Sequence, residues 1–152
     1  MVTTKTGLPF FSKLMFYGLC GFFTEVVFTA TWFFVDTKYD HGWKLHGCTS
    51  LWSFPIYGIS IYILERISLF IKPYLILPFR ILVYIAWTYL WEFSTGLLLR
   101  QLNACPWNYK DYTTYHVHGL ITLDYAPMWV IAVVLCEKIV IKCALNLQYV
   151  ET

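Results

Sequence analysis

Two glutamates stand inside apolar stretches of this chain, and they are the residues best placed to do chemistry. Glu25 and Glu92 each follow a basic residue, Lys13 or Arg80, by 12 positions. At 1.5 Å per helical residue, each carboxylate would lie about 18 Å along a helix, somewhat past the middle of a bilayer. An ionisable group at that depth is costly, and it marks a ligand, ion or proton site by default.

Small polar residues accompany both glutamates. Thr29 follows Glu25 by four residues and Thr95 follows Glu92 by three, so each threonine shares a helical face with its glutamate. Two facing carboxylates could hold a cation, share a proton or bind a polar head group. The alternative is that both are hydrogen-bonded and simply join helices, and the sequence leaves both interpretations open.

The chain contains two related copies of one segment, which explains why the glutamates come as a pair. Residues 46–66 match residues 118–138 at a constant offset of 72, and upstream Tyr17 and Glu25 match Tyr84 and Glu92 at an offset of 67. We therefore expect two tandem repeats, 13–66 and 80–138, within a single domain, 1–152. Identical pairs at the first offset include His46 and His118, Gly47 and Gly119, Pro55 and Pro127, and Glu65 and Glu137.

Composition indicates what positions these residues. The chain is 59% hydrophobic and only 13% charged, about half the charge of a soluble domain. Four apolar runs, near 14–35, 49–64, 81–99 and 120–141, approach the ~20 residues that cross a bilayer. Backbone groups in lipid must be paired internally, so the expected fold is all-α. It is a polytopic membrane protein with four transmembrane helices, arranged as two tandem hairpins in a parallel repeat.

Charge and motifs narrow the class further. Lys and Arg are more numerous in the segments that would share a side with the termini, which predicts that both termini are cytosolic. The protein itself is expected in the plasma membrane or an endomembrane. A net charge near +2 gives no footprint for nucleic acid. No phosphate-binding loop, nucleophile elbow or zinc-protease motif occurs, so we expect no cofactor and favour a protein that is not an enzyme.

The second and fourth apolar runs, which we call the return spans because they bring the chain back to its starting side, each contain a proline. Pro55 and Pro127 predict helix kinks. Either the kinked helices line a cavity, or nearby hydroxyls satisfy the backbone carbonyls that the prolines leave unpaired. Gly47 and Gly119 are expected to begin these helices, where a tight turn with positive φ is easy and bare amides could hold an anion.

Ionisable residues mark both ends of the return spans. His46 and His118 lie at the outer ends beside the aqueous loops, so interfacial hydrogen bonding is favoured over haem or metal binding, and no metal site is expected. Glu65 and Glu137 lie at the inner ends, each followed by a basic residue. We interpret them as interfacial ion pairs that fix the depth of the helix.

The outer loop of the second copy has no counterpart in the first. It contains Trp107 and Tyr109 among turn-forming residues, which predicts an ordered loop. Any functional asymmetry between the copies should arise there. Cys48 and Cys105 both fall near the outer surface, where a disulfide could join them in an oxidising compartment.

Several segments resemble a known family. They are Phe23-Thr-Glu-Val26, Trp91-Glu-Phe93, Cys105-Pro-Trp-Asn-Tyr109 and Gly119-Leu-Ile-Thr-Leu123. Over about residues 16–147 the chain resembles the transmembrane protein 229 family of animals, closest to its B branch. That family is similar to bacterial CmpB-like membrane proteins labelled "putative ABC-transporter type IV". The resemblance implies a multi-pass membrane protein, a role near phospholipid homeostasis and, if the permease label applies, a separate ATPase subunit.

The leading interpretation is a small multi-pass protein of transport or lipid-handling type, with Glu25 and Glu92 forming an intramembrane polar site. Its expected partners are membrane lipid and, because four helices enclose little volume, a second copy or a larger membrane complex. One alternative is a structural or assembly subunit of such a complex. Another is an intramembrane enzyme that modifies lipid.

Overall fold

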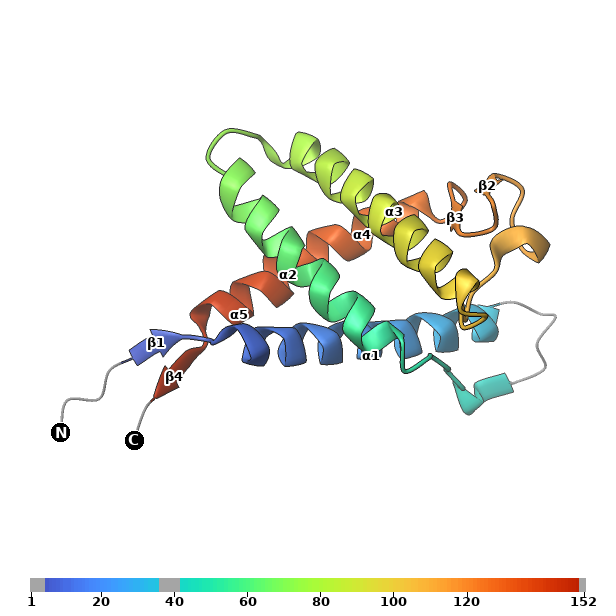
Figure 1. Cartoon of the computed structure of the whole chain (residues 1–152), viewed down its shortest axis with the longest axis horizontal. Helices are drawn as coiled ribbons and strands as arrows, with labels where there is room; N and C mark the ends of the chain where they lie inside the picture. The colour runs from blue at the N-terminus through green and yellow to red at the C-terminus, as the bar shows by residue number, and fades with distance from the viewer. Residues whose placement is uncertain (1–4, 36–41, 151–152) are drawn as a thin grey trace. The chain divides into compact units, whose positions relative to one another are not determined.

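The computed structural model describes residues 5–150, apart from 36–41, and is mostly helical (Figure 1). The chain divides into two compact units, residues 1–59 with 147–152, and residues 60–146. The boundary falls inside a helix and does not coincide with the expected repeats.

The described residues form five α-helices and three shorter helical segments. The helices are α1 (Phe10–Val35), α2 (Ser53–Ile71), α3 (Leu77–Gln101), α4 (Ala126–Leu135) and α5 (Lys142–Asn146), with short 3-10 turns η1 (Gly42–Lys44) and η2 (Tyr109–Asp111) and a π-helical segment η3 (Cys136–Ile141).

Among the described residues, three helices are long and apolar enough to cross a membrane. They are α1, α2 and α3, with 26, 19 and 25 residues. At 1.5 Å per residue they extend over roughly 39, 28 and 37 Å, against a hydrocarbon core of about 30 Å. The region of the fourth expected span forms α4, η3 and α5, which follow one another over 21 residues and are not among these three helices.

The two return helices begin later than hydropathy predicts. The helix expected at 49–64 occupies Ser53–Ile71, and the one expected from residue 120 begins at Ala126. Pro55 and Pro127 consequently lie in first turns instead of helix interiors, and there a missing amide costs nothing. The Leu51 carbonyl is not left open, because Phe54 N donates to it at 3.3 Å.

In the first unit, α1 and the first turns of α2 meet through small residues. A Cβ atom at Gly18 would lie 2.9 Å from the Phe54 ring, and one at Gly21 would overlap Tyr57. A Cβ at Gly58 of α2 would in turn lie 2.9 Å from the Leu14 carbonyl oxygen. The absence of side chains on both helices lets the backbones approach closely, which is the usual device for helix contact in lipid.

The segment before α2 is held on α1 by a threonine. Cys48 N donates to the Thr29 hydroxyl at 2.9 Å, and this hydroxyl lies 2.8 Å from the Cys48 carbonyl oxygen. Gly47 fits here because any Cβ would overlap the Val26 carbonyl oxygen of α1. The sequence predicted that Gly47 begins a helix, and this prediction was wrong, because α2 begins at Ser53. Gly47 instead lets the segment before α2 lie against α1.

The two ends of the described chain pair with each other. β1 (Lys5–Gly7) and β4 (Gln148–Val150) form an antiparallel ladder in which Lys5 pairs with Val150 and Gly7 with Gln148. Figure 1 shows the two strands side by side near the points marked N and C. Hydrogen-bonded strands share one compartment, so residues 5–7 and 148–150 lie on the same side of any membrane.

The core of the second unit lies between α2, α3 and the segment from α4 to η3. Leu64, Tyr84, Val133 and Ile141 are its buried apolar residues. The Trp87 indole donates to the Ser60 carbonyl oxygen at 3.3 Å, which ties α3 to α2. This packing fixes the first half of α3 and leaves its other end to carry the loop described below.

A buried ion pair joins α3 to η3. Arg80 donates from Nη2 to Glu137 Oε1 at 2.8 Å and from Nε to Oε2 at 3.2 Å. Nζ of Lys138, the expected interfacial partner, lies 3.9 Å from Glu137 Oε1, and the Lys138 side chain is half exposed. The expected ion pair of Glu137 with Lys138 is therefore present, but Arg80 is the closer partner, and Glu65 is buried as well. Both carboxylates face the protein interior because α2 continues past Glu65 and Arg80 lies within reach of Glu137.

Candidate functional site

Glu92 is held by a tyrosine from the outer loop. Tyr109, the first residue of η2, donates from its hydroxyl to Glu92 Oε1 at 2.6 Å, and both residues are partly buried. A hydroxyl-to-carboxylate bond of this length is of the strong, charge-assisted kind. The bond fixes the orientation of the carboxyl group and also attaches the loop to α3.

A tryptophan covers the same face of α3 one turn further on. Trp107 donates from its indole nitrogen to the Leu120 carbonyl oxygen at 3.1 Å. A Cβ atom at Gly96 would lie 3.0 Å from the Trp107 ring and 2.7 Å from Leu120. Gly96 therefore provides the space in which the loop packs on the helix, and the fully buried Leu120 seals it.

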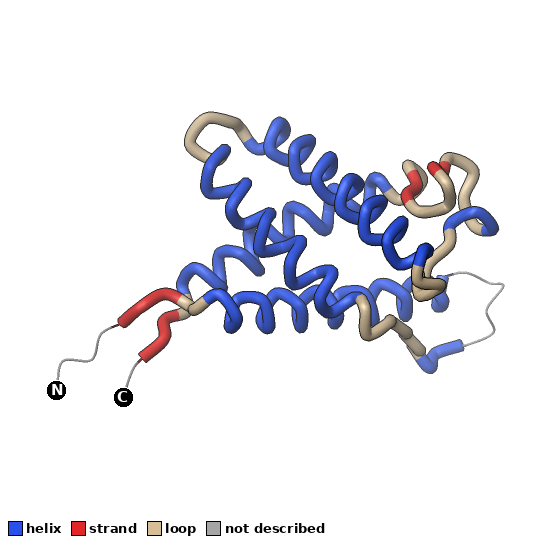
Figure 2. The backbone as a smooth tube through the Cα atoms, viewed as in Figure 1, coloured by secondary structure: helices blue, strands red, loops and turns tan. Residues whose placement is uncertain are grey.

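A short hairpin completes the site. β2 (His116–Val117) and β3 (Ile121–Thr122) are antiparallel, and Leu120 N donates to the Val117 carbonyl oxygen at 3.0 Å (Figure 2). His118 and Gly119 between them have φ of 53° and 68°, as in a type I′ turn. Gly119 thus lies in a hairpin turn and not at a helix start, and its carbonyl oxygen accepts from Tyr109 N at 2.8 Å.

Asp124 explains why the fourth helix starts late. Its Oδ2 accepts from the amides of Thr114 and Tyr115, at 2.9 and 3.2 Å, and lies 3.3 Å from the Thr122 hydroxyl. These bonds hold residues 120–125 in the hairpin. The residues are apolar enough to resemble a membrane span, but their polar partners place them in the loop.

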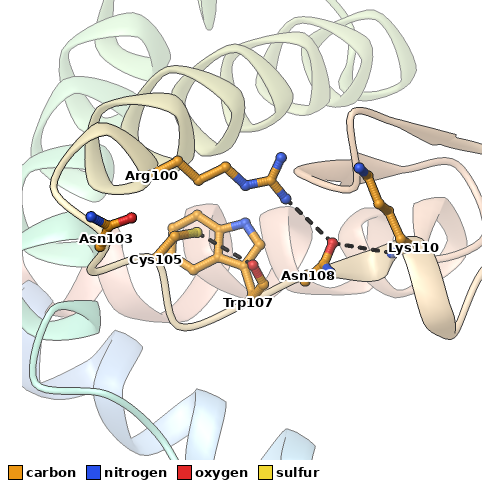
Figure 3. Close-up of a pocket in the computed structure, with 6 residues that line it drawn as sticks. All are labelled: Arg100, Asn103, Cys105, Trp107, Asn108 and Lys110. Atoms are coloured by element: carbon orange, nitrogen blue, oxygen red, sulfur yellow. Dashed lines mark hydrogen bonds between the residues drawn. The ribbon is translucent and has the colours of Figure 1, made fainter.

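A pocket of about 310 Å³ opens beside the hairpin turn (Figure 3). Arg100, near the end of α3, donates to the His118 carbonyl oxygen and, at 3.3 Å, to Asn108 Oδ1. The same Asn108 oxygen accepts from Lys110 N at 3.4 Å, so the two basic residues lie on either side of one amide. The lining residues are Arg100, Asn103, Cys105, Trp107, Asn108 and Lys110.

The charge of this pocket is uncompensated within the described part of the chain. Neither Arg100 nor Lys110 has a carboxylate partner among residues 5–35 and 42–150. The side chain of Lys110 makes no hydrogen bond there, since only its backbone amide bonds to Asn108. The pocket can therefore offer two cationic groups and the amides of two asparagines to an anion.

The expected site residues fall in both units. Glu92, Trp107, Tyr109 and Gly119 share one cluster in the second unit, and Glu25 lies in α1 of the first unit. The threonine hydroxyls bond mainly to backbone. Thr95 donates to the Trp91 carbonyl oxygen at 2.7 Å, and Thr29 binds the Cys48 backbone as described above. Neither hydroxyl is directed primarily at its glutamate.

The structure gives the surroundings of the two paired histidines and of two cysteines. His46 lies in the exposed segment before α2, and the His118 ring lies 6.3 Å from that of Phe93, centroid to centroid. No group of three metal-ligating side chains occurs where the structure describes the chain. Cys48 and Cys105 are free thiols, and the Cys105 thiol donates to the Trp107 carbonyl oxygen at 3.3 Å.

The sequence reasoning missed Arg100, Asn108 and Lys110. Arg100 reads as an ordinary basic residue at a helix end, and Lys110 as an ordinary loop residue. The available signal was their position on both sides of the aromatic loop, together with an asparagine two residues before Lys110 that caps η2. Their convergence depends on the hairpin, which hydropathy could not reveal.

Comparison of the chain with known protein families identifies a match. A family model described as "Putative ABC-transporter type IV" matches residues 12–151, which is most of the chain. The match includes all three long apolar helices except the first residues of α1, and the whole of the outer loop. No solved structure matches the chain.

Proposed function

The chain belongs to the putative ABC-transporter type IV family, and from this premise we propose that it is a transport-type membrane subunit whose polar site centres on Glu92. Its three apolar helices and its family make it an integral membrane protein of transport type. The observation that carries the proposal is the 2.6 Å bond from Tyr109 to Glu92, which orients a carboxyl group within an apolar helix.

A carboxyl group held in this way can take part in transport. It can exchange a proton or accept a cation or a polar head group, and Tyr109 keeps it aimed while the ligand changes. Glu25 is its counterpart by sequence repeat, and we propose that it plays the matching part in the first copy. Ligand binding by Glu25 and Glu92 remains a proposal from sequence and from this one bond.

Pairing of the chain ends supports four membrane crossings. β1 and β4 must share a side, so the number of crossings between them is even. The long helices α1, α2 and α3 give three, and the 21 residues of α4, η3 and α5 supply a fourth. We propose cytosolic termini and, from the family, a separate ATPase subunit and assembly with a second copy or a larger complex.

We also propose a narrower family assignment and a lipid-handling role. The Trp91-Glu92-Phe93 and Cys105–Tyr109 segments resemble the B branch of the transmembrane protein 229 family, which implies a lipid-handling role near phospholipid homeostasis. A structural subunit is the second candidate, favoured by one observation. The Tyr109–Glu92 bond joins the outer loop to α3, so the carboxylate could serve only to fix that loop.

Proteoliposomes that contain a trapped pH-sensitive dye separate these candidates. For the transport role we expect Glu92→Gln to abolish proton flux while the unfolding temperature stays close to that of the unchanged protein, because Gln still accepts from Tyr109. Ser94→Ala, an exposed neighbour on α3, is the matched control. Unchanged flux together with a lower unfolding temperature would instead identify Glu92 as structural.

A further inference from the structure

We propose that the pocket at the end of α3 binds a phosphate group, carried by a lipid head group or free in solution. The proposal goes beyond the role of Glu92, because the pocket has its own charged groups and shares only Trp107 with the cluster around Glu92. It stands on the convergence of Arg100 and Lys110 on Asn108, which lies between them, with Asn103 also in the lining.

The arrangement of donors suits an anion with several oxygens. Arg100 is held at one end by the His118 carbonyl oxygen and Asn108 Oδ1, which use two of its five N–H groups and fix the plane of the guanidinium. Its remaining donors and the Lys110 ammonium can then address different oxygens of one phosphate. Planar arginine and point-charge lysine are the two side chains that most often do this.

Two observations indicate that the pocket is built for a ligand. Both cations lack a carboxylate partner in the described residues, so an anion that enters the pocket meets no competing carboxylate there. The approach is also sterically specific, because a Cβ atom at Gly119 would overlap Asn108 Oδ1 and lie 2.7 Å from Lys110. The hairpin turn thus brings the Asn108 and Lys110 side chains close to the Arg100 guanidinium.

The lining also contains an apolar part. Trp107 and Cys105 form the floor beside the polar groups (Figure 3). An indole with one polar edge is the side chain that most favours the boundary between head groups and hydrocarbon. The pocket could therefore accommodate the phosphate together with the first carbons of a lipid, or a free phosphate alone.

Calorimetric titration of the full chain in detergent tests this proposal with two probes, inorganic phosphate and short-chain dihexanoyl phosphatidic acid. We expect Lys110→Gln to weaken binding by about tenfold or more, as for a lost charge-assisted bond. Lys110→Arg should retain binding. Lys44→Gln, which removes an exposed lysine of η1 outside the pocket, is the matched control and should bind like the unchanged protein.

The two probes distinguish the sources of the phosphate. Binding of phosphatidic acid alone, lost in Lys110→Gln, assigns the pocket to a lipid head group, and binding of both probes assigns it to phosphate from either source. Absence of binding by either probe overturns the proposal, as does a loss in Lys44→Gln equal to that in Lys110→Gln. Titration measures no flux, so its failure would leave the role of Glu92 to the proteoliposome assay.

Discussion

At the scale of single residues, the Tyr109 hydroxyl is the group that fixes the Glu92 carboxyl group on α3. Glu92, Trp107 and Tyr109 were each expected to matter, and the structure brings them into one cluster. The hydrogen bond between Glu92 and Tyr109 could not be predicted, because the loop that leads from the end of α3 at Gln101 to Tyr109 has no regular sequence pattern that fixes its path. The bond between Arg80 and Glu137 could not be predicted either, because the two residues lie 57 positions apart in the sequence.

Tyr109→Phe isolates the contribution of the hydroxyl. Removing a hydrogen bond to a charged group costs about 1.5–3 kcal/mol, so we expect a corresponding fall in the free energy of unfolding in detergent. Tyr112→Phe is the matched control, because Tyr112 lies in the same loop with an exposed ring. Equal stability of the two variants would show that the Glu92–Tyr109 bond contributes nothing.

At the scale of elements, hydropathy located the helices but misplaced the starts of two of them and the end of α2, which was expected at residue 64 and lies at Ile71. The third helix was expected at 81–99 and occupies Leu77–Gln101, a close agreement. The second and fourth begin several residues late, because residues 49–52 and 120–125 are apolar but belong to segments outside the helices. Thr29 holds the first of these segments and Asp124 the second, and neither polar contact is visible in a hydropathy profile.

The glycine that lets the first segment lie on α1 provides a test. In Gly47→Ala the new Cβ would overlap the backbone oxygen of Val26, so the segment must move. Overpacking of this kind typically costs about 1–3 kcal/mol of unfolding free energy. Gly7→Ala is the control, because nothing lies within 4 Å of a Cβ at position 7. A similar unfolding midpoint for both variants would contradict the close approach.

The buried ion pair between α3 and η3 makes a second prediction at this scale. Either Arg80→Ala or Glu137→Ala leaves an uncompensated buried charge and should destabilise the protein by about 3–5 kcal/mol. The double variant should lose less than the sum of the two, as a double-mutant cycle of unfolding free energies would reveal. Lys138→Ala should have almost no effect, since its side chain is half exposed. Additive single effects would exclude direct coupling.

At the scale of the whole molecule, class and family were predictable and the number of crossings was not settled by hydropathy alone. The low charge content already indicated a membrane protein, and the family match agrees with the CmpB-like resemblance. The internal repeat and the paired glutamates remain predictions from sequence. The pairing of β1 with β4 could not be foreseen, because both strands have three residues and no distinctive pattern.

This pairing predicts a common location for the two ends. Epitope tags placed before β1 and after β4 should be digested together, or protected together, when protease is added to sealed vesicles of one orientation. An even number of crossings is the physical reason. Protection of one tag and digestion of the other would show that one of the four apolar segments does not cross.

The β1–β4 ladder also suggests that the helices could follow one another in a different order along the chain without a change of fold. Because residues 5–7 and 148–150 are already neighbours, a short linker could close the polypeptide into a ring. New ends could then be opened at Lys72–Ile76, the mostly exposed connection between α2 and α3. Such a circular permutant would start with α3 and end with α2 while retaining every helix of the original chain.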